Sequence, residues 1–245
     1  MKTSTALMAL GAAFTVALPA LAEPTSTVVG FDGGTDGGFQ GNALFEPTGG
    51  NPGGVARTNG LIEFPSLRTG GVGEPANPAF LGDYSSFTDI TFSVDAITYS
   101  LTDFIGNQSI RSIGVALINR DIVGTDGPAG VYFELGSIAQ FINPDWTTYS
   151  TTIADPTSTT LPSGWIGFGS TNLSTFEPEL PAGTTFADIL SNVTEFQISG
   201  AVPGFFYGPI NADYSIDNIS ITVPAPGSVA LLGLGGLAAT RRRRR

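Results

Sequence analysis

Alternation of apolar and polar residues is the main regularity along this chain. Ile90, Phe92, Val94 and Ala96 share one side of an extended backbone, and polar residues occupy the positions between them. A period of two is typical of a half-buried β-strand. Comparable stretches, rich in β-branched and aromatic residues, recur along the chain. They predict strands over residues 28–31, 61–64, 90–96, 110–119, 130–135, 146–153, 165–168, 193–199 and 213–223.

Glycine and proline separate these stretches. Residues 32–41, 49–54 and 68–78 are predicted loops, and residues 121–127 a turn. Helical spacing occurs once, over residues 185–192, and the last strand has a predicted bulge at Asp217–Asn218. The pattern predicts an all-β fold, an antiparallel β-sandwich. Its long loops and large size favour a jelly roll over an immunoglobulin-type sandwich.

The two ends do not follow the strand pattern. Lys2, an apolar run over residues 6–18 and the sequence A-L-A at 20–22 have the layout of a secretory signal peptide. Residues 228–240 are apolar and precede five arginines: Arg241, Arg242, Arg243, Arg244 and Arg245. A membrane-spanning helix needs about 20 apolar residues, so this shorter segment favours transient insertion, with the arginines on the cytoplasmic side. The alternatives are a disordered basic tail and an amphipathic surface helix.

The sequence before this segment is Val223-Pro224-Ala225-Pro226-Gly227. Together with the short apolar segment and the arginines, it resembles a PEP-CTERM sorting signal. That resemblance implies a bacterial protein that is exported and then processed by an exosortase, with its C-terminus first held in the inner membrane. Ala225 stands where the motif has glutamate, which leaves the processing enzyme open. The predicted parts are a signal peptide (1–22), a β-domain (23–223) and a sorting segment (224–245).

Without its two ends, the chain is strongly acidic. Arg57, Arg68, Arg111 and Arg120 are its four basic residues beside all 21 acidic ones, so its net charge is −17. Such a surface repels nucleic acid, which excludes nucleic-acid binding. Cysteine and histidine are absent. The fold therefore forms without disulfides, and Ser-His and Cys-His catalysis are excluded.

Three further stretches resemble a laminin type IV (laminin B) domain and, more broadly, the galactose-binding-like jelly rolls. They are N-P-G-G at 51–54, F-L-G-D at 80–83 before the strand at 90–96, and residues 189–198 before 215–220. The resemblance implies an extracellular, usually non-catalytic jelly roll, often with a structural calcium ion that joins the first and last strands. Asp217 is the residue it assigns to calcium, with Asp32 as a neighbour. The alternatives are a solvated or bulge-capping carboxylate at Asp217 and a glycine turn at Asp32.

Candidate ligand-binding residues are the aromatic side chains Phe205, Phe206 and Tyr207, which lie among glycine and proline. A glycoside hydrolase would need two facing carboxylates, and no pair stands out among the acidic residues. We therefore expect a non-catalytic protein of the cell surface or extracellular matrix. The alternatives are a carbohydrate-binding module, with an extracellular polysaccharide as partner, and, third, a hydrolase.

Overall fold

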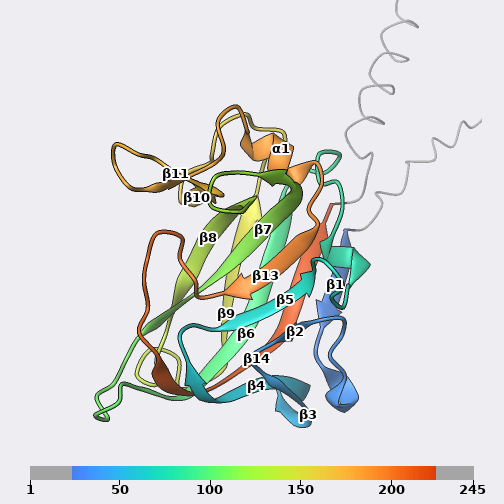
Figure 1. The fold of residues 1–245 in the computed structure, drawn as a ribbon. Coiled ribbons are helices and arrows are strands. Elements are labelled where there is room, and N and C mark those ends of the chain that lie inside the picture. Colours follow the sequence, from blue (N-terminus) through green and yellow to red (C-terminus); the bar gives the residue numbers. More distant parts are fainter. Residues whose placement is uncertain (1–23, 225–245) are drawn as a thin grey trace, which may run out of the picture. The chain divides into compact units, whose positions relative to one another are not determined.

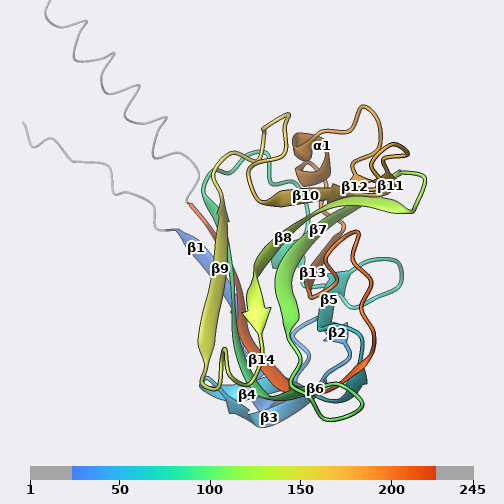
Figure 2. The same ribbon diagram turned by 90° about the vertical axis from the view of Figure 1, so that its left-hand side faces the viewer.

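Two antiparallel six-stranded sheets stack face to face over residues 24–224, the part of the chain that the computed structural model describes (Figures 1 and 2). The predicted all-β sandwich is confirmed. The predicted signal peptide and most of the sorting segment lie outside these residues. Within residues 24–224, no helix is long and apolar enough to cross a membrane.

Sheet A contains both the first and the last strand of the domain. Its members are β1 (Thr25–Val29), β3 (Leu44–Gly50), β4 (Gly53–Ile62), β6 (Ile90–Thr102), β9 (Thr147–Ile153) and β14 (Ile210–Val223). Their order is β3-β4-β14-β6-β9, and β1 also pairs with β14. Strands β4 and β1 occupy the same edge of β14 in succession, because β4 pairs with its first half and β1 with its last residues.

Sheet B forms the front layer in Figure 1, with the order β10-β8-β7-β13-β5-β2. Its members are β2 (Gln40–Gly41), β5 (Ser66–Gly70), β7 (Arg111–Val123), β8 (Pro128–Ile138), β10 (Trp165–Phe168) and β13 (Glu195–Ser199). The remaining elements are a small β11–β12 hairpin (Ser170–Thr171 and Pro178–Glu179), the helix α1 (Phe186–Leu190) and 3₁₀ turns at Asp32–Gly34 and Pro78–Phe80.

Aromatic side chains fill the space between the sheets. Phe92 from β6 and Phe196 from β13 meet there, with ring centroids 5.5 Å apart. Phe80 lies 4.9 Å from Phe196 and 5.3 Å from Phe39. All four rings are fully buried. Burying each such ring contributes about 1.5–3 kcal/mol, so the alternating pattern in the sequence fixes which face of each strand points inward.

The prediction was incomplete where strands contain glycine. Strands β3 and β5 and most of β4 lie in or beside the stretches predicted as loops. Glycine is required there because backbones approach closely. A Cβ on Gly54 would lie 1.9 Å from the Phe31 carbonyl oxygen, and one on Gly41 equally close to that of Ser66. Glycine in a strand interior often marks such an approach. From composition alone, however, a glycine-rich stretch is predicted to be a loop.

The predicted helical turn is confirmed as α1. Thr185 caps it: its hydroxyl accepts from the Asp188 N–H, and the Asp188 carboxylate accepts from the Thr185 N–H. This reciprocal pair is a capping box. The predicted bulge is also present, because the register of β14 shifts after Asp217 and Asn218 has a positive φ of 49°.

Candidate functional site

The outer face of sheet B is the candidate site. Along β13, Phe196 and Ile198 point into the core, so Glu195, Gln197 and Ser199 point outward. The pairing register continues this outer row across neighbouring strands. Opposite Gln197 lie Ala116 of β7 on one side and Arg68 of β5 on the other, and Tyr132 of β8 lies beyond Ala116.

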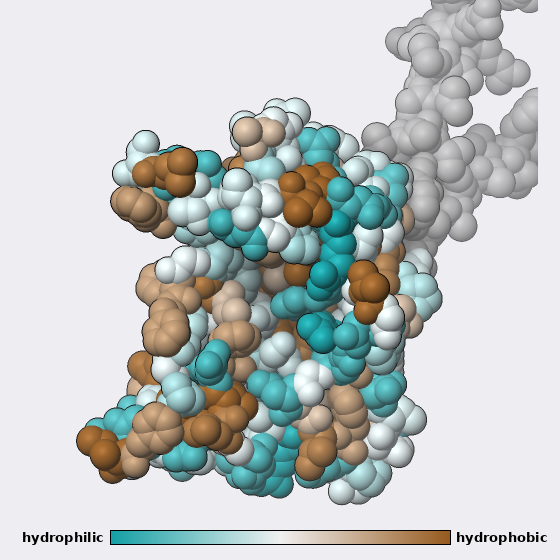
Figure 3. Space-filling model, viewed as in Figure 1, coloured by the Kyte–Doolittle hydropathy of each residue, from teal (hydrophilic) through white to brown (hydrophobic). Residues whose placement is uncertain are grey.

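A cleft of about 510 Å³ opens over this face. Strands β7, β8, β10 and β13 form its floor, and two loops, after β11 and after β13, form its walls. Figure 3 shows the recess from the front, with hydrophobic side chains gathered on its left and hydrophilic ones on its right. The cleft therefore has an apolar side and a polar side.

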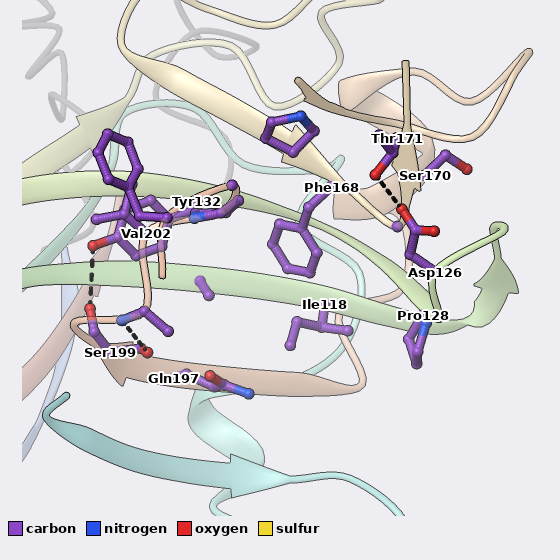
Figure 4. A pocket seen from close by; sticks show the side chains of 18 of the residues that line it. Ile118, Asp126, Pro128, Tyr132, Phe168, Ser170, Thr171, Gln197, Ser199 and Val202 are labelled. Carbon is purple, nitrogen blue, oxygen red and sulfur yellow. Dashed lines mark hydrogen bonds between the residues drawn. The ribbon is translucent and has the colours of Figure 1, made fainter. Parts of the chain in front are cut away.

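Glycines make room for the apolar side. A Cβ on Gly130 would lie 2.3 Å from the Phe168 ring, and one on Gly114 would lie 2.4 Å from the Tyr132 hydroxyl oxygen. The two rings therefore lie over bare backbone (Figure 4). The Tyr132 hydroxyl donates to the Ser199 carbonyl, 3.2 Å away, and burial raises the pKa of Tyr132. Tyr132 thus supports the floor, and Phe168 lines the cleft.

Two exposed phenylalanines stand on the walls. Phe176, in the β11–β12 hairpin, is 79% exposed, and Phe205, in the loop after β13, is 70% exposed. Both line the cleft. The two loops touch, since a Cβ on Gly204 would lie 2.9 Å from the Pro178 ring. An apolar face of a ligand could therefore contact aromatic rings from two separate segments.

The loop after β13 is fastened to the sheet by Arg111. Its guanidinium donates to the carbonyl oxygens of Glu63 and Gly208, at 2.7 and 2.6 Å. It also lies over the Tyr207 ring, 5.4 Å from the ring centroid. Tyr207 in turn stacks on Phe205, with centroids 6.4 Å apart. These contacts hold the Phe205 wall in place.

The polar groups of the cleft include a carboxylate and an amide. Asp126 accepts from the hydroxyls of Thr171, at 2.6 Å, and of Thr125, at 3.3 Å. It is the one carboxylate among the described residues that line the cleft. Gln197 is half-buried on the floor. The site therefore offers aromatic faces, uncharged hydrogen-bonding groups and one carboxylate.

The three aromatic residues predicted from the sequence to bind a ligand lie in different positions relative to the cleft. Phe205 lines the cleft, Tyr207 packs beneath it, and Phe206 is 92% exposed and does not line it. Sequence reasoning missed Phe168 and Phe176. Phe168 had a signal, since it alternates with the buried Trp165 and Gly167 along β10. Phe176 had none, because its hairpin shows no strand pattern.

A second polar cluster lies where β1 and β4 meet on β14. Asp217 is fully buried there. Its carboxylate accepts from the backbone N–H groups of Asn51, at 2.5 Å, and Asn218, at 2.7 Å. Burial raises the pKa of Asp217; the two N–H groups lower it, and the charges of Asp95 and Asp32 raise it further. We call this cluster the β1–β14 junction.

Asp95, on β6, extends the junction across the sheet. It accepts from the side-chain amides of Asn218, at 2.9 Å, and Asn51, at 3.2 Å, and from the Thr148 hydroxyl, at 2.6 Å. Of the five hydrogen bonds to Asp95 and Asp217, two come from Asn51 in the turn between β3 and β4, two from Asn218 in the bulge of β14, and one from Thr148 of β9. The bulge therefore serves as a point of connection for three strands.

Three oxygen atoms of the junction surround Gly30. A Cβ at that position would lie 3.4 Å from Asn218 Oδ1, 3.7 Å from Asp217 Oδ1 and 3.9 Å from Asp32 Oδ2. The two residues assigned to calcium are thus neighbours. Carboxylate and amide oxygens are ligands that calcium accepts. Within residues 24–224, however, no group of three or more His, Cys, Asp or Glu side chains is arranged to hold a metal ion, so calcium stays a prediction.

The predicted sorting motif begins at the end of the described chain. Val223 is the last residue of β14, where it pairs with Thr25, and Pro224 follows it. Ala225, Pro226, Gly227 and the five arginines lie outside the described residues, so the sorting motif remains a prediction.

The strands and the cleft define a class, a two-sheet antiparallel β-sandwich with an open cleft on one face. The chain matches no protein-family model and no curated protein. Solved structures do match. One is the C-terminal family 22 carbohydrate-binding module of Clostridium thermocellum Xyn10B, at 12% identity and a TM-score of 0.42; the match covers 82% of this chain and 95% of that one.

Two other solved structures are similar to this chain. The family 11 carbohydrate-binding module from Clostridium thermocellum is 12% identical, with a TM-score of 0.41 and coverage of 83% of this chain and 90% of that one. The L4b domain of human laminin alpha-2 is 17% identical, with a TM-score of 0.30 and coverage of 68% and 84%. The last is of the kind named by the sequence resemblance.

Proposed function

We propose that this protein is an exported, non-catalytic β-sandwich of the jelly-roll type that binds an uncharged polysaccharide in the cleft over sheet B. The observation that carries the proposal is the make-up of the cleft. Phe168, Phe176 and Phe205 line it beside Gln197 and hydroxyl groups. Sugar rings present apolar C–H faces and hydroxyl edges, and this combination suits both.

Charge favours a neutral ligand over an acidic one. None of the four arginines lines the cleft, and Asp126 does. A uronic acid would therefore meet a carboxylate, within a domain of net charge −17, and like charges repel. The cleft is also open to solvent on the face seen in Figure 3, which suits a polymer chain better than an enclosed small molecule.

Affinity electrophoresis through gels that contain a soluble polysaccharide tests this proposal. The probes are a xylan, a mannan and a mixed-linkage β-glucan, the kinds of sugar named for similar structures, with alginate as the anionic comparison. We expect retardation by at least one neutral polymer and none by alginate. Free migration in all neutral gels, with isothermal titration calorimetry also silent, would refute the proposal.

Hydrolysis is the weaker alternative. Both retaining and inverting glycosidases need a pair of carboxylates across the bond they cleave. Asp126 has no carboxylate partner among the described lining residues, and hydroxyl groups bond to both of its oxygens. Release of reducing ends from the bound polysaccharide, lost in Asp126→Asn, would favour the hydrolase instead.

Export and sorting rest on the two ends of the sequence. We infer that the signal peptide directs secretion, and that Pro224, Pro226 and the arginines retain the chain at the membrane for an exosortase-type enzyme, with the cell surface or matrix as its destination. The test is expression in a bacterium with and without the exosortase. We expect the protein to be shorter at its C-terminus in the strain with the exosortase. The same protein mass in both strains would contradict this inference.

We also propose that the β1–β14 junction binds a structural calcium ion. The oxygens of Asp32, Asp217 and Asn218 around Gly30 support it. When bound, the ion would supply positive charge between buried carboxylates and so tie the first strand to the last. It would have no part in ligand binding, which takes place on the other sheet.

A further inference from the structure

Gln197 occupies an unusual position on the cleft floor. Its register partner on β7 is Ala116, whose side chain is a single methyl group and leaves the amide uncovered on that side. Among residues 24–224, the Gln197 side chain makes one hydrogen bond, from Nε2 to Glu195 Oε1, at 2.5 Å. Its Oε1 accepts from no described residue, although Gln197 lines the cleft.

The partner of Gln197 is itself held rigidly. Glu195 is fully buried, and its Oε2 accepts from Arg120 Nε and also pairs with Arg120 Nη2, each at 2.5 Å. Arginine stays protonated, and a carboxylate bonded to it can only accept hydrogen bonds. Because Glu195 Oε1 can only accept, the Gln197 atom that faces it must be the NH₂ group.

This determines the orientation of an amide whose two ends otherwise look alike. With Nε2 fixed on Glu195, the carbonyl oxygen of Gln197 turns to the other side of the amide. Glu195 is fully buried, so turning the Gln197 amide oxygen toward it would place two acceptors against each other and remove a hydrogen bond from a buried carboxylate, which is costly. The amide therefore cannot reverse its donor and acceptor ends cheaply when a ligand enters.

We propose that Gln197 Oε1 accepts a hydrogen bond from a hydroxyl group of the bound polysaccharide, and that Glu195 and Arg120 position this acceptor. The inference rests on the proposed function and deepens it. It assigns the ligand an uncharged donor, a free hydroxyl, next to the sugar face that contacts Phe168, Phe176 and Phe205. A sugar position capped as a methyl ether would not satisfy the acceptor.

The chain contains a matched control for Gln197. Gln40, on β2, is the register partner of Arg68 on the side opposite to Gln197, and its Nε2 also donates to a glutamate, Glu74. Gln40 does not line the cleft. The two glutamines thus share residue type, sheet face and kind of partner, and they differ in access to the ligand.

The test is calorimetric titration of the full chain with the neutral polysaccharide that retards it. We expect Gln197→Leu to weaken binding about tenfold, since an unmade hydrogen bond leaves a ligand hydroxyl without its partner. Gln40→Leu should stay within about twofold of the unchanged protein. Glu195→Gln should weaken binding about threefold or more, because its amide can accept or donate and no longer dictates the orientation of Gln197.

A second readout separates positioning from mere structural support. Partial O-methylation of the polysaccharide should weaken binding to the unchanged protein more than to Gln197→Leu, since only the former uses the capped hydroxyl. Gln197→Ala serves in place of Gln197→Leu if the latter does not fold. Equal sensitivity to methylation in both proteins, or unchanged affinity in the variant, would overturn this inference while the proposed function stands. Absence of binding by the unchanged protein overturns both.

Discussion

The two outer faces of the sandwich are built from the same alternating strands, yet they differ in how their polar groups are satisfied. On sheet A, one row runs across four strands through Thr152, Thr91, Thr222 and Ser26. Thr91 and Thr152 share a hydrogen bond of 2.9 Å between their hydroxyls, and so do Ser26 and Thr222. The next row repeats this between Ser93 and Ser220, at 2.7 Å.

Among residues 24–224, no two hydroxyl side chains of sheet B pair with each other over the cleft. Glycines replace side chains under Phe168 and Tyr132, and Gln197 keeps one end free. A hydroxyl that is bonded to its neighbour offers little to a ligand, whereas an uncovered ring or a free acceptor gains from contact. The comparison indicates that the two faces differ in how many of their polar groups lack a partner, rather than in how many polar groups they have, and this favours sheet B as the face that would bind a ligand.

The largest effect is expected from removal of the cleft walls. Phe176→Ala combined with Phe205→Ala should weaken polysaccharide binding about a hundredfold, because aromatic anchors carry most of the energy of an interface. Both rings are exposed, so the melting temperature should hardly change. Calorimetry measures the affinity, and the matched change on sheet A is Thr91→Ala with Thr222→Ala. If that sheet A pair weakens binding as much, the assignment of faces is wrong.

The next effect concerns the β1–β14 junction on sheet A, where the carboxylates of Asp95 and Asp217 follow the rows of paired hydroxyls. With calcium at ten times its dissociation constant, the native state gains about 1.4 kcal/mol, or roughly 3–6 °C in melting temperature. Asp32→Ala should remove this gain. Asp36→Ala is the control, since Asp36 bonds only to the nearby Gly38 N–H. Thermal unfolding with calcium and with chelator measures both, and an unchanged gain in Asp32→Ala would refute the calcium assignment.

A smaller effect is expected from breaking the hydrogen bond between the Ser93 and Ser220 hydroxyls on sheet A. Ser93→Ala or Ser220→Ala alone should cost about 1 kcal/mol, since each leaves the other hydroxyl without its partner. The double variant should cost little more than either single one. Urea unfolding of the four proteins gives the coupling free energy. Strictly additive costs would mean that the two hydroxyls are satisfied by water instead.

The smallest effect is expected at α1, away from both faces. Hydrogen bonds from Thr185 lower the pKa of Asp188 below its ordinary 3.8. A carboxyl whose pKa is lower in the folded state than in the unfolded state stabilises the fold at pH values above its unfolded-state pKa. This contribution is lost as the pH falls through the folded-state pKa. Because Asp188 is exposed, the contribution is about 0.5 kcal/mol or less. Asp188→Asn should therefore shift urea midpoints slightly at pH 6 and not at all near pH 2. A larger loss at pH 2 would contradict this.

Most of the long strands of the two sheets were predicted from the sequence. Period-two alternation identified β6 and β14, and the span of β10 was predicted without error, because burial on one side dictates which residues alternate. Strands β3 and β5 were missed because they contain glycine, which the sequence analysis took as a sign of loops. These glycines are needed where another part of the backbone comes close, and that happens only in the folded chain. Local sequence does not encode such distant approaches.

The candidate site was less predictable than the fold. The family resemblance pointed to Asp32 and Asp217, and both carboxylates lie within 4 Å of a Cβ built on Gly30; their role in calcium binding stays a prediction. Gln197 had no signal, because its role depends on Glu195 and Arg120, which are 75 residues apart and meet only through strand pairing. A cleft is made by such pairings and by loop lengths, which a single sequence does not specify.

The place of β14 at the centre of sheet A has a mechanical consequence. This strand pairs with β6 along one side and with β4 and then β1 along the other. Hydrogen bonds in an antiparallel sheet lie perpendicular to the strands, so a pull on Val223 along the strand axis loads them in shear and all at once. A domain tethered through its C-terminal end would hold against drag by its most heavily bonded strand, with its cleft on the other sheet free to engage a polymer.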